Sequence, residues 1–182
     1  MNSVYDDSFL ALPYLAAISI GRAPGASAEA VRMAGLIVSA ADDERRARYA
    51  EEIAVLLPTA RRLLSSEVNN AVAFVHLLQC VLAFGGERVW SAGRLEGLFE
   101  QEYEIECPVC ASSLFIAFGD YGTFSSAGDY VTADPVKAAL LPADPATLAP
   151  LPARLYHMAT EAGHEQVARA DVSLRPGDLP GL

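Results

Sequence analysis

The spacing of the apolar residues changes near residue 102, and this change constrains the fold more than any other feature. Before it, apolar residues recur every three or four positions, which is the period of an amphipathic helix. Residues 102–106 instead alternate charged with apolar side chains, which is the period of a strand. Residues 114–118 are mostly aromatic or β-branched and favour a second strand. The sequence therefore predicts a helical region followed by a β-hairpin.

The helical region divides into segments separated by short breaks. Its apolar stripes predict helices over residues 8–20, 27–41, 42–64, 66–84 and 87–99. Pro13 is expected to kink the first helix, and Pro58 lies in the middle of the third. Asp42 or Asp43 is the expected N-cap of the third helix. Helices joined by such short breaks pack as antiparallel neighbours.

The patterns after the hairpin are weaker. Residues 119–134 are rich in Gly, Ser, Asp and aromatic residues and predict an ordered loop, while residues 141–152 predict a surface connector. A last helical pattern covers residues 153–170 and breaks at Gly163. The Pro/Gly-rich residues 171–182 predict a flexible tail.

Two parts of the helical region show the same pattern of helices and prolines. The segments that begin at Phe9 and Ala47 each hold an apolar helix with an interior proline, a break and a second apolar helix. This similarity, at a period of roughly 40 residues, fits a HEAT or armadillo-like stack. An irregular helical bundle without repeats fits the periodicity equally well. In either case we expect a mainly α fold, with one domain over residues 1–170 and the hairpin and loop inserted at 102–134.

Composition and charge exclude several classes of protein. Hydrophobic residues make up 52% of the chain, with a mean hydropathy of +0.24, so it is not disordered. Polar residues interrupt the apolar run 71–83, which is shorter than the roughly 20 residues of a membrane span. The net charge of −10 opposes nucleic-acid binding. The N-terminus is acidic and does not predict a signal peptide. A count of three cysteines suits a reducing cytoplasm.

A pair of cysteines, Cys107 and Cys110, lies in the turn of the predicted hairpin, in the sequence Cys-Pro-Val-Cys. A C-x₂-C turn presents two thiolates to one metal ion, and structural zinc takes four ligands of this kind. The turn therefore supplies half of a zinc site and is similar to one knuckle of a zinc ribbon. The candidates for the other ligands are Cys80, His76, His157 and His164.

Each of these residues also has a simpler interpretation. Cys80 lies within an apolar helix, where a cysteine packs as a small hydrophobe, and His157 and His164 are expected to be exposed. The pair also resembles the thiol–disulfide motif C-P-x-C, but that motif precedes a helix, and the residues after Cys110 favour a strand. The expected cofactor is accordingly none, or zinc held by the pair, with a reversible disulfide as a further alternative.

The sequence holds no established catalytic motif: no phosphate-binding glycine loop, no nucleophile elbow and no H-E-x-x-H. Strand alternation places Glu102, Glu104 and Glu106 on one face of the hairpin, most simply a solvated face. Residues 119–124 could contact a ligand, but such loops are more often packed by their own aromatic side chains. We therefore assign no catalytic residue; the sequence leaves enzymatic activity open and favours its absence.

Three segments carry a resemblance to a group of largely uncharacterised actinobacterial proteins with HEAT-like helical repeats: residues 4–15, residues 21–25, and residues 103–110 with the strand that follows. The resemblance covers most of residues 4–170 and implies an α-solenoid with a curved surface that binds other proteins. In such proteins a second C-x₂-C pair follows the last helix and completes a Cys₄ site. This chain has no cysteine after Ala170, so we expect its C-terminus to be truncated or replaced and its N-terminus to begin inside a first repeat.

These patterns favour a non-catalytic interaction or scaffold protein of the cytoplasm, which binds a protein partner through its helical surface. An incomplete repeat array leaves an apolar face uncovered, so a homodimer is a secondary expectation. Neither nucleic acid nor a membrane is an expected partner. One alternative is an enzyme or small-ligand protein with a pocket near residues 119–130. Another is a zinc- or redox-responsive regulator centred on Cys107 and Cys110.

Overall fold

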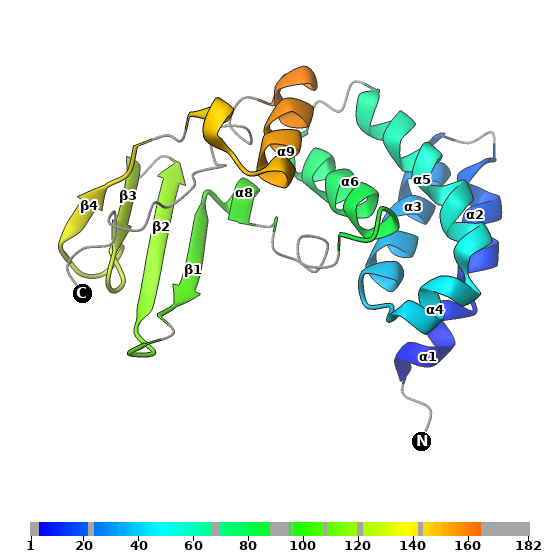
Figure 1. Cartoon of the computed structure of the whole chain (residues 1–182), viewed down its shortest axis with the longest axis horizontal. Coiled ribbons are helices and arrows are strands. Elements are labelled where there is room, and N and C mark those ends of the chain that lie inside the picture. The colour runs from blue at the N-terminus through cyan, green and yellow to red at the C-terminus, as the bar shows by residue number, and fades with distance from the viewer. Residues whose placement is uncertain are drawn as a thin grey trace. The chain divides into compact units, whose positions relative to one another are not determined.

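Two structural units make up the chain, Met1–Glu96 and Gly97–Leu182. The computed structural model describes residues 4–21, 24–66, 70–87, 95, 97–107, 109–119, 122–141 and 144–164. Within these ranges the first unit is helical, and the second holds a sheet with short helices (Figure 1).

The first unit is built around the long apolar helix α6. Its helices are α1 (Val4–Phe9), α2 (Leu12–Ser19), α3 (Pro24–Ser39), α4 (Asp43–Arg48), α5 (Ala50–Ser65) and α6 (Ala71–Phe84). Helix α6 packs against both α3 and α5, and α2 packs against the same two helices. The fully buried large side chains include Leu12, Val31, Val38, Leu56, Phe74, Leu78 and Leu82. The apolar stripes found in the sequence therefore meet in one core.

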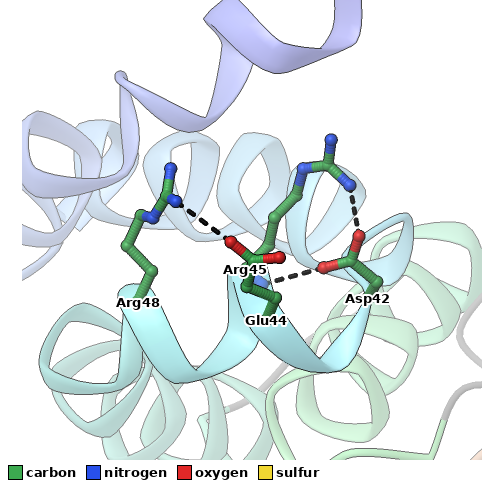
Figure 2. A network of polar contacts seen from close by, with 4 residues as sticks. All are labelled: Asp42, Glu44, Arg45 and Arg48. Carbon is green, nitrogen blue, oxygen red and sulfur yellow. Dashed lines mark hydrogen bonds and ion pairs between the residues drawn. The ribbon is translucent and has the colours of Figure 1, made fainter.

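Polar side chains fix where the helices begin and end. Asp42 caps α4, as expected, because its carboxylate accepts a hydrogen bond from the Arg45 backbone N–H at 2.8 Å (Figure 2). The same carboxylate pairs with the Arg45 guanidinium. Asn70 caps α6 and accepts from the N–H groups of Val72 and Ala73 at 2.9 and 3.2 Å. Capping at Asn70 places the start of α6 five residues later than the sequence pattern predicts.

The two prolines occupy different places in their helices, which removes the basis of the expected repeat. Pro13 lies in the first turn of α2, where its missing N–H is not needed, so it begins a helix and does not kink one. Pro58 lies inside α5, as predicted, but the segment before it breaks at Tyr49. The segments beginning at Phe9 and Ala47 are therefore not equivalent units.

The second unit contains an antiparallel sheet in which sequence neighbours are spatial neighbours. Its strands, in the order β1-β2-β3-β4, are β1 (Glu102–Glu106), β2 (Ser113–Gly119), β3 (Gly122–Ser126) and β4 (Lys137–Ala139) (Figure 1). The remaining elements are α8 (Gly97–Glu100), a 3-10 turn at Pro145–Thr147 and α9 (Pro150–Glu161). Helix α9 stops just before Gly163, which has a φ of 75°. The break predicted at Gly163 is thus confirmed.

The predicted fold class, a mainly α HEAT or armadillo-like α-solenoid, is wrong. The structure is mixed α/β, with a sheet of four strands. The hairpin of β1 and β2 is confirmed, but β3 lies where the sequence pattern predicts a loop. Phe124 and Tyr130, from that same segment, form the core of the sheet with Ala117. The expected flexible tail at residues 171–182 and most of the expected helix 87–99 lie outside the described residues.

Candidate functional site

The cysteine knuckle is the turn that joins β1 to β2. The Cys107 N–H donates to the Ser112 carbonyl at 2.9 Å, and the Ala111 N–H donates to the Cys107 carbonyl at 2.9 Å. Ala111 has a φ of 55°, in the left-handed region that lets a chain reverse tightly. Beyond this turn the strands continue in regular register, beginning with the pair Glu106 and Ser113. The two cysteines are therefore held at the end of a regular hairpin.

Both thiols of the knuckle are free, with Cys110 exposed and Cys107 partly buried. The Cys110 Sγ lies 3.3 Å from the Ser112 Oγ. Hydrogen bonds from the Ser112 side chain, from the Ser112 backbone and from the Cys107 thiol hold the pKa of Cys110 below its ordinary value of 9.0. Thiolates bind metals and attack disulfides, so the exposed Cys110 is the better placed of these two thiols for either reaction.

The other proposed ligands occupy separate surroundings. Cys80 is buried on α6 in the first unit. His157 is exposed on α9, with its ring 5.7 Å from that of Tyr156, and His164 follows the end of the same helix. Among the residues that the structure describes, no three His, Cys, Asp or Glu side chains gather to hold a metal ion. The structure thus brings Cys107 and Cys110 together without a third ligand from this set.

The buried thiol of Cys80 is expected to make the folded protein less stable at alkaline pH. Burial raises its pKa from the ordinary 9.0 to about 12, so above pH 9 the unfolded chain loses this proton while the folded chain keeps it. The free energy of unfolding therefore falls as pH rises between these two values. From pH 8 to pH 10 this contribution is about 1 kcal/mol. Denaturant titrations at both pH values should show this extra loss in the wild type relative to Cys80→Ala; equal losses would contradict it.

The three glutamates of β1 do share one face of the sheet, because they pair with Ala117, Phe115 and Ser113 on β2. The expectation of a wholly solvated face is wrong at Glu102. Its carboxylate accepts a hydrogen bond from the Tyr130 hydroxyl, whereas Glu104 and Glu106 are exposed. Strand pairing explains the difference, since Ala117 pairs with Phe124 as well as with Glu102 and brings the aromatic core to that end.

An aromatic cluster of Phe115, Phe124 and Tyr130 fills the face of the sheet near residues 119–130. The Tyr130 ring packs edge-to-face with Phe124 at 4.9 Å and with Phe115 at 6.0 Å. The Lys137 ammonium lies 4.9 Å from the centre of the Phe124 ring. Asp129 has a lowered pKa because it accepts hydrogen bonds from the side chain and backbone of Thr132 and from the Val131 N–H, all within one turn. These contacts give structural roles to Phe124, Asp129 and Tyr130, and a pocket near residues 119–130 stays a prediction.

Three neighbouring arginines, Arg45, Arg46 and Arg48, make their polar contacts within the helical unit. Arg48 pairs with Glu44 at 3.2 Å, beside the Asp42 and Arg45 pair (Figure 2). Arg46 donates to the carbonyls of Ala83 and Phe84 at 2.7 and 3.1 Å, at the C-terminal end of α6. The positive charge of these three arginines is therefore matched by local carboxylates or helix carbonyls. The absence of nucleic-acid binding remains a prediction.

Apolar stripes on the surface of the helical unit were not evident from sequence periodicity. Leu10, Tyr14 and Ile18 follow one another every four residues along α2 and the turn before it, with exposed fractions of 63%, 72% and 47%. On α3, Met33 and Leu36 are 49% and 70% exposed. We call these five residues the α2–α3 stripes. The helices that carry them pack against each other.

Comparison with known proteins gives no match: no family model, no curated protein and no solved structure is similar to this chain. The resemblance to actinobacterial repeat proteins therefore stays a prediction. Across the described residues, no helix is both long enough and apolar enough to cross a bilayer.

Proposed function

We propose that this protein is a non-catalytic binding module that receives a protein partner on the α2–α3 stripes. The observation that carries the proposal is the exposure of five large apolar side chains on two adjoining helices and the turn that precedes the first of them. Single exposed apolar residues are ordinary on protein surfaces, but grouped ones are typical of protein interfaces. Free thiols at all three cysteines suit a reducing compartment, so we include the cytoplasm in the proposal.

The chemistry of the surface indicates the kind of partner. Covering a side chain of the size of Leu36 releases about 1.5–3 kcal/mol, so a few such contacts sustain a specific complex. An ion pair between Glu29 and Arg32, 3.3 Å apart, borders the stripe on α3. The net charge of the chain is −10. We therefore expect a partner with an apolar centre and a basic rim, such as an amphipathic helix rich in lysine or arginine.

Site-specific photo-crosslinking tests the proposal. A photoreactive residue is placed at Tyr14 or at Leu36, with a matched control at the exposed Glu51 of α5. In a lysate of the source cells, the two stripe positions should crosslink to the same protein, and the control position should not. Excess unlabelled wild type should compete, while Tyr14→Ser/Leu36→Ser should compete at least tenfold less well, because each truncation removes more than about 1 kcal/mol.

The double variant changes only exposed side chains. Its free energy of unfolding, measured by thermal denaturation, should therefore match that of the wild type within about 0.5 kcal/mol. Equal competition by the folded double variant would contradict the proposal. So would crosslinking that is equally strong from Glu51, since that pattern indicates non-specific encounters.

A further inference from the structure

The knuckle offers two ligands at the tip of a regular hairpin, and structural zinc takes four. The turn is closed by two backbone hydrogen bonds, so Cys107 and Cys110 are presented together. Both thiols are free, and that of Cys110 is exposed. Two thiolates bound to one zinc ion leave half of its tetrahedral coordination open on the side away from the turn.

The chain has few soft ligands to complete this coordination. It contains three cysteines and three histidines, and all six lie among the described residues. Within that described set, no third ligand joins the pair. The third cysteine, Cys80, is tightly packed, since a Cβ added at Gly35 would lie 2.4 Å from its Sγ. Two further thiolates are therefore available only from another molecule.

Two exposed apolar side chains also lie at or near the tip of the hairpin. Val109, between the two cysteines, is 80% exposed, and Ile105 on β1 is 40% exposed. Covering exposed apolar side chains at a loop tip with another protein surface is favourable, because it removes them from water. A second copy of the chain presents the same two thiols and the same valine, which suits a two-fold symmetric contact in which each copy contributes the same residues.

We propose that the knuckle is half of an intermolecular Cys₄ zinc site, which Cys107 and Cys110 from each of two copies complete. The zinc ion lies on the two-fold axis and joins the two hairpin tips. Each thiol loses its proton to solvent as it binds, and no oxidation or reduction takes place. The module then becomes bivalent, because each dimer carries two sets of α2–α3 stripes.

The test uses full-length reduced protein stripped of metal, at about 0.15 M salt, where the Debye length of about 8 Å screens the acidic chains from each other. Zinc is added in steps while sedimentation velocity records mass and a chelating dye records free metal. We expect a monomer without zinc, a dimer at one zinc per two chains, and return to monomer with EDTA. Cobalt in place of zinc should give the absorption spectrum of tetrahedral tetrathiolate coordination.

Three variants isolate the site. Cys110→Ser should lose zinc-dependent dimerisation, and Cys80→Ala, which removes a thiol elsewhere, should keep it. Tyr14→Ser/Leu36→Ser should also keep it, so failure of the stripe proposal and failure of this one are distinguishable. The inference is overturned by one zinc per chain without a change in mass, by dimerisation that ignores zinc or the Cys110 substitution, or by no zinc binding.

Discussion

Replacing Phe124 with alanine is expected to lower the free energy of unfolding of the sheet unit by about 3–5 kcal/mol. Phe124 is 7% exposed and belongs to the buried aromatic cluster. Its ring packs edge-to-face with Tyr130, and Lys137 lies over it. Truncation therefore removes the buried ring, the aromatic pair and the cation–π contact together.

Hydrogen exchange read by mass spectrometry separates this effect from the helical unit. In Phe124→Ala, peptides from β2 and β3 should lose protection, while peptides from α6 keep it. Thr123→Ala, one residue away on the opposite face of β3 and exposed, should change protection little. Phe124→Leu, which keeps most of the volume, should fall between the two. Equal loss in Thr123→Ala and Phe124→Ala would mean that strand pairing, and not the cluster, holds the sheet.

Local sequence patterns predicted the features that local physics determines. The hairpin was predictable because β1 alternates strictly and β2 is rich in aromatic and β-branched residues. The cap at Asp42 was predictable because a carboxylate before a helix satisfies its free N–H groups. Strand β3, with the sequence Gly-Thr-Phe-Ser-Ser, carries little strand preference of its own. It pairs because β2 lies beside it and Phe124 is buried, and neither fact can be read from a short window.

Surface features were the least predictable part of the candidate sites. Periodicity identifies which residues of a helix are apolar, but it does not show which of them another element covers. Ile20 and Met33, which belong to the apolar patterns that predict the first two helices, are 64% and 49% exposed. The two cysteines were found from their spacing alone, because a C-x₂-C turn keeps its ligands close in any fold. The isolation of that pair from other ligands depends on tertiary structure.

Glycine at position 35 is the second place where a single change is expected to have a large effect. Helices α3 and α6 approach closely there, so that a Cβ added at Gly35 would lie 2.4 Å from the Cys80 Sγ and 3.2 Å from its Cα. Alanine favours a helix over glycine by about 1 kcal/mol, which alone would make Gly35→Ala stabilising. The contact with Cys80 opposes this gain, because the nearest atoms belong to a buried side chain and to the backbone.

Overpacking a core typically costs about 1–3 kcal/mol, and occasionally more. We expect this cost to exceed the gain in helix preference, so that Gly35→Ala destabilises the helical unit by about 2 kcal/mol net. Urea unfolding followed by far-ultraviolet circular dichroism, with hydrogen exchange on α3 and α6 peptides, measures this loss. Cys80→Ala removes the Sγ, so Gly35→Ala should cost less in that background than in the wild type. An unchanged cost would place the strain elsewhere, and a stabilised Gly35→Ala would show that the two helices move apart freely. The close approach explains why a helix interior holds a glycine: at this position, the space between α3 and α6 outweighs the conformational preference of the chain.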